Sequence, residues 1–298
     1  MAFVGERVSR ETIDYDGRAK RTETKLSQFG GNVGYLDVKR SNPLKKTKVL
    51  AVINQKGGVG KSTTVVNLSA ALGENKKKVL VVDLDPQGNT SSGYGIEKEE
   101  LEADIYDALL NDHSIENLIV GTCEPRVFAL PATIQLAGAE VELVTIDGRE
   151  HKLKEILDTI KEHFDYVLID CPPSLGLLTV NALVAADELL IPIQCEFYAL
   201  EGVTKLLESM RMVKGRLNPD LEIFGVLLTM YDSRTTLSKQ VAEEVQNYFG
   251  KKVFKTIIPR NVKLSEAPSH GLPVTQYARL SKGAQAYIKL AKEVTRRG

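Results

Sequence analysis

The amino-acid sequence predicts an α/β fold in which a mostly parallel, twisted β-sheet is covered by helices on both faces. Two patterns predict this fold. Short continuous apolar runs recur along most of the 298 residues, and segments with apolar residues at helical spacing lie between them. Strands that are apolar along their whole length are typical of parallel sheets buried between helices, because neither face of such a sheet meets water.

Seven apolar runs are the candidate strands. They are residues 49–53, 79–82, 127–130, 166–169, 188–191, 223–228 and 253–258. Helical spacing occurs at residues 64–73, 204–217 and 238–249. Residues 283–298 also have a helical pattern, and we expect Tyr287, Leu290 and Val294 to pack that helix against its own domain. This order of elements places a single α/β domain at residues 48–298.

Residues 1–47 differ in composition from the rest of the chain. Through Lys48 the sequence has eleven basic and six acidic residues, a net charge of +5, whereas the formal net charge of the whole chain is zero. Large apolar residues are few, and Gly30, Gly31 and Gly34 disfavour a helix. We therefore predict a flexible, mildly basic N-terminal extension over residues 1–47. The alternative is a solvated tail without a dedicated role.

Composition argues against several classes of protein. Cys123, Cys171 and Cys195 are far apart and form no CxxC pair, which argues against a disulfide framework or a zinc site. No apolar run approaches the roughly 20 residues of a membrane span. The first residues carry acids and lack the layout of a signal peptide. We therefore expect a cytoplasmic protein with no membrane segment.

A glycine-rich segment follows the first predicted strand and precedes the first predicted helix. Residues 55–63 read QKGGVGKST. In this context the glycines let backbone N–H groups face phosphate oxygens, and the helix N-terminus adds its positive dipole end. The pattern predicts a P-loop NTPase, with Lys61 on the β- and γ-phosphates and Ser62 on Mg²⁺. The predicted nucleotide-binding residues of this loop are Lys56, Gly57, Gly58, Val59, Gly60, Lys61, Ser62 and Thr63.

Acidic residues end two of the other predicted strands. Asp83 and Asp85 follow the run at 79–82, and Asp170 follows the run at 166–169. Ligands of α/β sheets bind outside the carboxyl ends of the strands, so these carboxylates are expected near the P-loop. An apolar strand that ends in one acid is the Walker B layout, in which Asp170 would hold Mg²⁺. The alternative for each acid is an ordinary turn residue.

The loop departs from the standard P-loop pattern at Gln55, which stands where the first glycine is expected, and at the extra lysine Lys56. This K-G-G-x-G-K-[ST] arrangement resembles the deviant Walker A motif of the ParA/MinD family of ATPases. The resemblance covers residues 48–298 and is closest to the chromosomal ParA (Soj) branch. It runs through residues 83–89, 130–133, 136–142, 170–176, 194–202 and 258–271.

The resemblance implies roles for individual residues. Lys56 would reach the nucleotide of the other subunit in a dimer, and Lys56, Lys61 and Asp85 would be the catalytic residues. Asp85 would orient the attacking water beside Mg²⁺, so that Ser62, Asp85 and Asp170 form the metal site. The counterparts of four later residues line an adenine pocket in the family, which implies ATP as the nucleotide. These residues are Met230, Pro259, Arg260 and Asn261.

The resemblance also implies partners and a cellular role. We expect a homodimer in the ATP state that binds double-stranded DNA without sequence preference through Arg234 and Lys263. Such a protein would associate with the nucleoid and segregate a chromosome or plasmid with a ParB-type protein. A MinD-like membrane-cycling ATPase and a non-catalytic ATP-gated scaffold are the alternatives. The C-terminal helix lacks the bulky apolar anchors of the first, and an intact Asp85 argues against the second.

Overall fold

The computed structural model describes residues 11–13, 19–21, 37–196 and 201–298, and the side chains of residues 37–196 and 203–298. Contacts divide the chain into two units, residues 1–30 and 31–298. In the first unit β1 (Glu11–Ile13) pairs with β2 (Ala19–Arg21) in antiparallel fashion. The flexibility predicted for most of residues 1–36 lies outside the described residues.

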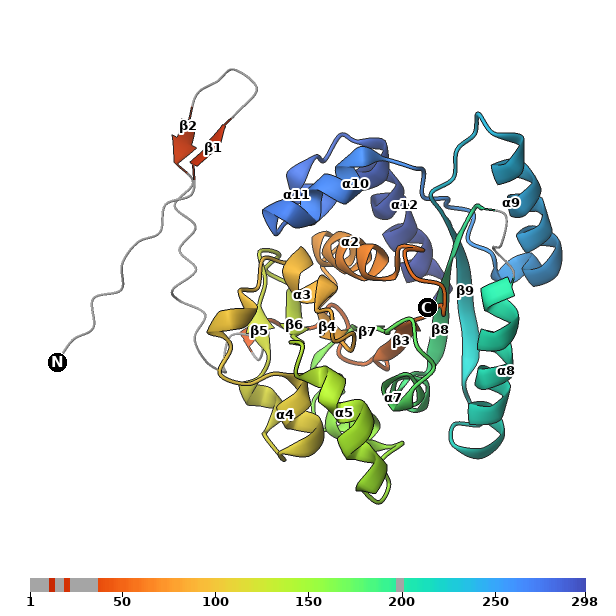
Figure 1. Cartoon of the computed structure of the whole chain (residues 1–298). Coiled ribbons are helices and arrows are strands. Elements are labelled where there is room, and N and C mark those ends of the chain that lie inside the picture. Colours follow the sequence, from red (N-terminus) through yellow and green to blue (C-terminus); the bar gives the residue numbers. More distant parts are fainter. Residues whose placement is uncertain (1–10, 14–18, 22–36, 197–200) are drawn as a thin grey trace. The chain divides into compact units, whose positions relative to one another are not determined.

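The second unit is built on a seven-stranded sheet (Figure 1). Its strand order is β5-β6-β4-β7-β3-β8-β9, and all neighbours are parallel except β5 and β6. This arrangement confirms the predicted fold class. The strands are β3 (Lys48–Val52), β4 (Val79–Asp83), β5 (Val120–Gly121), β6 (Val127–Leu130), β7 (Tyr166–Asp170), β8 (Glu188–Gln194) and β9 (Glu222–Thr229).

Helices cover both faces of the sheet (Figure 1). One face carries α2 (Lys61–Glu74), α3 (Asn89–Gly93), α10 (Val262–Glu266), α11 (Val274–Tyr277) and α12 (Lys282–Arg297). The other carries α4 (Ile105–Leu110), α5 (Leu136–Glu142), α6 (Lys152–Asp158), α7 (Leu177–Ala185) and α8 (Glu201–Arg216), with α9 (Thr236–Phe249) beside β9. Short 3₁₀ turns are η1 (Lys98–Glu100), η2 (Ile115–Asn117), η3 (Leu143–Thr145), η4 (Lys161–His163), η5 (Gly250–Lys252) and η6 (Ala267–His270).

The core has one apolar cluster on each face of the sheet. Along β3, Val49 and Ala51 belong to the cluster beneath α4–α9, whereas Leu50 and Val52 belong to the cluster beneath α2 and α12. This alternation follows from the two-residue period of a strand. It also explains why each strand reads as a continuous apolar run. The C-terminal helix α12 buries Tyr287, as predicted.

One predicted strand is wrong. Residues 253–258 form no named strand and meet β9 only through an isolated bridge of Val253 to Val226 and single hydrogen bonds. The amides of Lys255 and Thr256 instead donate to the carboxylate of Glu293 on α12, at 2.9 and 3.0 Å. A local apolar pattern could not reveal this competing acceptor, because it comes from a helix 37 residues further along the chain.

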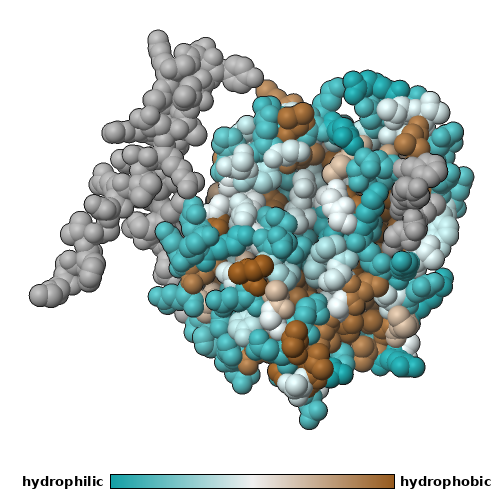
Figure 2. All heavy atoms as spheres, viewed as in Figure 1, coloured by the Kyte–Doolittle hydropathy of each residue, from teal (hydrophilic) through white to brown (hydrophobic). Residues whose placement is uncertain are grey.

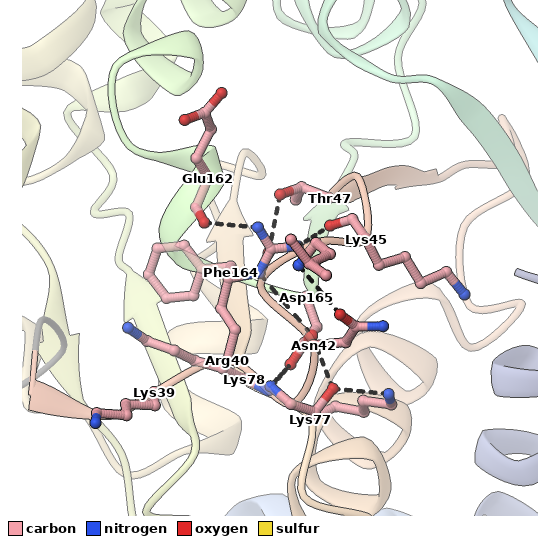
Figure 3. A network of polar contacts seen from close by, with 12 residues as sticks. Lys39, Arg40, Asn42, Lys45, Thr47, Lys77, Lys78, Glu162, Phe164 and Asp165 are labelled. Atoms are coloured by element: carbon pink, nitrogen blue, oxygen red, sulfur yellow. Dashed lines mark hydrogen bonds and ion pairs between the residues drawn. The ribbon is translucent and has the colours of Figure 1, made fainter.

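Composition places residues 37–47, here called the strap, in the N-terminal extension. Hydrogen bonds nevertheless join the strap to the rest of the large unit (Figure 3). The carboxylate of Asp165 accepts hydrogen bonds from Ser41 N at 3.0 Å, Ser41 Oγ at 2.8 Å and Lys78 N at 2.8 Å. The Thr47 hydroxyl donates to Phe164 O at 2.9 Å. The contacts therefore begin before the 47/48 boundary that composition suggests. Polar anchors hold this segment, so apolar patterning misses it.

An Asp165→Ala variant is expected to lower the free energy of unfolding by about 3 kcal/mol, because it leaves amide and hydroxyl donors without their acceptor. Burial opposes ionisation of Asp165, but hydrogen bonds from Lys78 and Ser41 and the charge of Lys77 outweigh it and lower its pKa. The stabilisation is present above the unfolded pKa of about 3.9 and is lost as pH falls through the lower folded pKa.

Urea unfolding at pH 7 and at pH 3 measures both effects. Asp158→Ala is the matched control, because this carboxylate forms surface ion pairs with Lys154 and Lys161 and should change stability by less than about 1 kcal/mol. Equal destabilisation by the two variants would show that Asp165 is not the anchor of the strap.

Candidate nucleotide site

The glycine-rich loop connects the carboxyl end of β3 to the start of α2. Gly58 and Gly60 have φ angles of 73° and 89°, in the left-handed region that glycine adopts at little cost. Gly60 is the N-cap of α2 and supplies no side-chain cap to the helix amides. The loop therefore presents a helix N-terminus that suits an anion, as the sequence predicts.

Lys61 lies at the centre of this loop and is only 7% exposed. Its Nζ atom lies 3.4 Å from Lys56 O, across the loop. Burial lowers the pKa of Lys61, while the charges of Asp170 and Asp85 act in the opposite direction. The predicted phosphate lysine and both predicted acids are thus within electrostatic range of one another.

Two acids at the ends of β4 and β7 are direct neighbours. Asp83 pairs in register with Asp170, and both side chains are buried. Burial and the charge of Asp170 raise the pKa of Asp83, although Ser91 donates to it from N at 2.8 Å and Oγ at 2.7 Å. Burial likewise raises the pKa of Asp170. Two carboxylates in such a site favour a shared proton or a nearby cation.

The oxygens around Asp170 fit a magnesium ion. Thr90 Oγ1 donates to Asp170 Oδ2 at 2.7 Å, while the buried Oδ1 atom has no hydrogen-bond partner among the described residues. The Ser62 hydroxyl is close enough to favour the ionised form of Asp170. No group of three or more His, Cys, Asp or Glu residues in the described part of the chain could hold a metal alone. A hard cation here would therefore need further oxygens, such as those of a phosphate.

Asp85 and Lys56 are the two other predicted catalytic residues near this cluster. Asp85 is 7% exposed and accepts a hydrogen bond from Gln87 N at 3.0 Å, as a turn residue does. It is nevertheless close enough to Lys61 to act on its pKa. Lys56 is half-buried, and its backbone N donates to Asn54 Oδ1 at 3.0 Å. Within the described residues, the Lys56 side chain makes no ion pair.

Two late loops meet beside the glycine-rich loop. Tyr231 N donates to Ile258 O at 3.1 Å and Arg260 N donates to Tyr231 O at 3.0 Å, which brings Met230 next to residues 259–261. Met230 has a φ of 52°, an uncommon value outside glycine. Thr229 Oγ1 donates to Val59 O at 2.8 Å and joins this region to the glycine-rich loop.

These contacts include residues that sequence reasoning missed. Thr90, Ser91 and Thr229 position Asp170, Asp83 and the glycine-rich loop, respectively. Thr90 bonds an acid 80 positions away, and Thr229 bonds a carbonyl 170 positions away. Small hydroxyl residues are common in turns and helix caps, so no local signal separates these from the others. Cys171 is buried with a raised pKa, which is typical of a cysteine that packs in the core rather than of a nucleophile.

The two predicted DNA contacts lie in separate segments, Arg234 in the loop between β9 and α9 and Lys263 on α10. Arg234, whose side chain is 86% exposed, forms two hydrogen bonds with Asp232, from Nε at 2.9 Å and Nη2 at 2.7 Å. These bonds lower the pKa of Asp232. Lys263 on α10 donates to Glu266 Oε2 at 2.7 Å. Exposed pairs of this kind are weak, so a phosphate could compete with either carboxylate.

Comparison with known proteins gives a consistent family assignment. The AAA domain family matches residues 47–223. The chain is 57% identical over 251 residues to the sporulation initiation inhibitor protein Soj of Bacillus subtilis, covering 84% of this chain and 99% of Soj. It is 51% identical over 250 residues to the chromosome partitioning protein ParA of Myxococcus xanthus, covering 84% and 88% of the two chains.

Solved structures share the fold. Cobyrinic acid a,c-diamide synthase from Mycobacterium smegmatis, crystallised with ADP and magnesium, has a TM-score of 0.74 and 42% identity, covering 84% of this chain and 95% of the other. The cell division ATPase MinD of Pyrococcus furiosus has a TM-score of 0.71 and 29% identity, covering 85% and 100%. With its glycine-rich loop between β3 and α2 and its similarity to Soj and ParA over most of its length, this chain belongs to the ParA/Soj family of chromosome-partitioning ATPases.

Proposed function

We propose that this chain is a MgATP-dependent, dimerising ATPase that binds DNA without sequence preference and drives segregation of a chromosome or plasmid with a ParB-type partner. The observation that carries the proposal is the convergence of Lys61, Asp85 and Asp170 at the carboxyl ends of β3, β4 and β7, beside a loop with a second lysine. Sites of this composition at this edge of a sheet bind nucleotide phosphates.

In the proposed mechanism, residues 57–63 bind the phosphates through their backbone N–H groups, and Lys61 neutralises the β- and γ-phosphates. Ser62 and Asp170, with Asp85 nearby, would hold Mg²⁺, which when bound withdraws charge from the phosphate oxygens. Asp85 orients the attacking water. Residues 230 and 259–261 form the base pocket, which adjoins the glycine-rich loop through the contact of Thr229 with Val59. ATP is the nucleotide that the family resemblance implies.

Dimerisation would complete the site. Lys56 lies at the start of the glycine-rich loop, and its side chain makes no ion pair within the described residues of its own chain. From there it would reach the γ-phosphate of the second subunit and stabilise charge that develops during transfer. Apolar side chains gather around α5 and α7 in a largely hydrophilic surface (Figure 2). Ile134, Val141 and Leu175 are exposed there, and such a patch supports a protein contact.

DNA is the proposed ligand of the ATP-bound dimer, through Arg234 and Lys263, and this places the protein in the cytoplasm at the nucleoid. No helix in the described part of the chain is long and apolar enough to cross a membrane. The apolar face of α12 is buried in the core, so it offers no membrane anchor either. Release of ADP-bound monomers, stimulated by the ParB-type partner, would move the DNA cargo.

An Arg234→Glu variant is expected to bind duplex DNA at least about tenfold more weakly in the ATP state, because a phosphate contact becomes a repulsion. Fluorescence anisotropy with two labelled duplexes of unrelated sequence, in ATP and in ADP, measures the effect. The matched control is Lys251→Glu, an exposed charge on η5. Undiminished binding by Arg234→Glu would remove this surface from the proposal.

A further inference from the structure

The helix α7 begins directly after the loop of residues 171–176, which follows β7. Its N-cap residue is Gly176, which has no side chain to bond the first amides of the helix. Such amides have no partner inside their own helix and need an acceptor from elsewhere. Leu177 N donates to Glu140 Oε2 at 2.7 Å, and Leu178 N donates to Glu140 Oε1 at 3.4 Å. A carboxylate of α5 therefore caps α7.

The lack of a side chain at residue 176 makes this cap possible. The helices α5 and α7 lie on the same face of the sheet (Figure 1). A Cβ atom at Gly176 would overlap both oxygens of the Glu140 carboxylate. Gly176 has a φ of −83° in an extended conformation that any residue can adopt, so it is the close approach that requires glycine. The negative carboxylate also lies at the positive end of the α7 dipole, which strengthens the contact.

The loop between β7 and α7 is held at both ends. At its first residue, Cys171 N donates to a carbonyl oxygen of β3 at 3.3 Å. Near its other end, Thr179 Oγ1 in the first turn of α7 donates to Ser174 O at 2.6 Å. Residues 172–173 are both proline, whose fixed φ limits the motion of the loop. The second half of the loop is therefore attached to the turn of α7 that Glu140 caps.

This loop adjoins the acid that is proposed to hold Mg²⁺. Asp170, the last residue of β7, directly precedes it. The metal ions of phosphoryl-transfer sites bridge the β- and γ-phosphates, so the loop lies at the γ-phosphate end of the proposed site. Displacement of a reacting group by about 1 Å can lower a rate by about 100-fold. The contact that fixes this loop can therefore affect the transfer step.

The opposite end of α7 has a comparable contact that does not reach the loop. Asn218 Nδ2 donates to the carbonyl oxygens of residues 183, 184 and 186, at 2.9, 3.3 and 2.8 Å. That end of the helix precedes β8, at the amino-terminal edge of the sheet. One helix thus has a contact beside the loop and another far from it. Comparing the two separates an effect on the loop from an effect on the stability of α7.

We propose that Glu140 is a positioning residue of the ATPase reaction, because it holds the loop of residues 171–176 at the γ-phosphate end of the site. The inference rests on the proposed function. Glu140 needs no contact with the nucleotide, since it acts through the first amides of α7. Its removal leaves Lys61 and the glycine-rich loop in place and loosens the loop after Asp170. It therefore lowers kcat and leaves KM for ATP unchanged.

Steady-state hydrolysis tests this role. Glu140→Ala is expected to lower kcat at least about tenfold, with KM for ATP within about twofold of the unmodified value. Glu140→Gln keeps one acceptor oxygen for Leu177 N and should retain kcat within about threefold. Glu142→Ala is the control on the same helix, because this exposed carboxylate accepts from the Tyr106 hydroxyl at 3.0 Å. Asn218→Ala is the control for α7, and both controls should keep kcat within about twofold.

Hydrogen exchange of the amides of residues 171–178, in the full-length protein without nucleotide, measures the loop directly. Glu140→Ala should exchange there at least about tenfold faster than the unmodified protein, whereas Asn218→Ala should not. This measurement does not require hydrolysis. If the unmodified protein hydrolyses no ATP, the proposed function fails, and exchange still decides whether Glu140 holds the loop.

Thermal unfolding of each variant completes the comparison. If Glu140→Ala and Asn218→Ala lower kcat equally, Glu140 only stabilises α7 and the proposal is overturned. Unchanged exchange, an unchanged kcat, or a Glu140→Gln variant as slow as Glu140→Ala also contradicts it. A raised KM with a constant kcat would assign Glu140 to ATP binding instead. Should Glu140→Ala fail to fold, Glu140→Asp applies the same test, because it keeps the charge but is one methylene shorter.

Discussion

A Lys61→Ala variant is expected to hydrolyse ATP about 1,000-fold more slowly than the unmodified protein. Lys61 lies within the glycine-rich loop, and the charges of Asp170 and Asp85 act on its pKa. Its burial removes water that would screen its charge, so its attraction for phosphate is stronger than that of a surface lysine. Loss of this charge should weaken both ATP binding and the transfer step.

Steady-state phosphate release and equilibrium binding of a fluorescent ATP analogue measure the two effects of Lys61→Ala separately. Lys154→Ala, which removes an exposed lysine of α6, is the control and should leave both unchanged. Thermal unfolding of the nucleotide-free variants shows whether the fold is intact. Hydrolysis within threefold of the unmodified rate, in a folded variant, would mean that phosphate is not bound at this loop.

An Asp85→Ala variant is expected to bind ATP but to hydrolyse it about 10²- to 10³-fold more slowly, because it loses the group that orients the attacking water. The dimer should then persist, since hydrolysis is the step that returns it to monomers. Light scattering with ATP should give a dimer for Asp85→Ala and a monomer for the Lys56→Ala/Asp85→Ala double variant. The double variant tests the two roles separately. Lys56 would act on the nucleotide of the other subunit, whereas Asp85 would act on the water in its own subunit.

Asp147→Ala removes an exposed carboxylate of similar size and should behave as the unmodified protein in every measurement. If Asp85→Ala remains a monomer at saturating ATP, the proposed ATP-dependent dimerisation is wrong. Rapid hydrolysis by a stable dimer would instead show that another residue orients the water. ATP binding, dimerisation and ATP hydrolysis are all measured on the same variant. A defect in one of them can therefore be distinguished from a defect in the other two.

The strands and the glycine-rich loop could be predicted because their signals are local. Six of the seven apolar runs are strands, since a strand buried on both faces needs consecutive apolar residues whatever its neighbours are. The loop at 55–63 is likewise readable, because glycines and Lys61 must follow one another to surround a phosphate. The prediction for residues 253–258 was wrong because Glu293 competes for their amides.

The strap illustrates the limit of composition. Lysines and few apolar residues are typical of a solvated tail, yet Ser41 and Thr47 are hydrogen bonded to the turn before β7. Such anchoring depends on Asp165, which lies more than a hundred residues away and is by itself an unremarkable acid. The same separation conceals Thr90 and Thr229, which position the candidate nucleotide site.

The amino-acid sequence alone determined six strands and four helices of the α/β domain, the glycine-rich loop with its two lysines, and the acids at the ends of two strands. Only the tertiary structure decided that Asp83 and Asp170 are neighbours, that Asp170 Oδ1 has no partner among the described residues, and that Ser41 of the strap is hydrogen bonded to Asp165. The first group follows from backbone periodicity and from contacts between successive residues. The second depends on which distant segments pack together, and that is decided by burial of the whole sheet between its two helical layers.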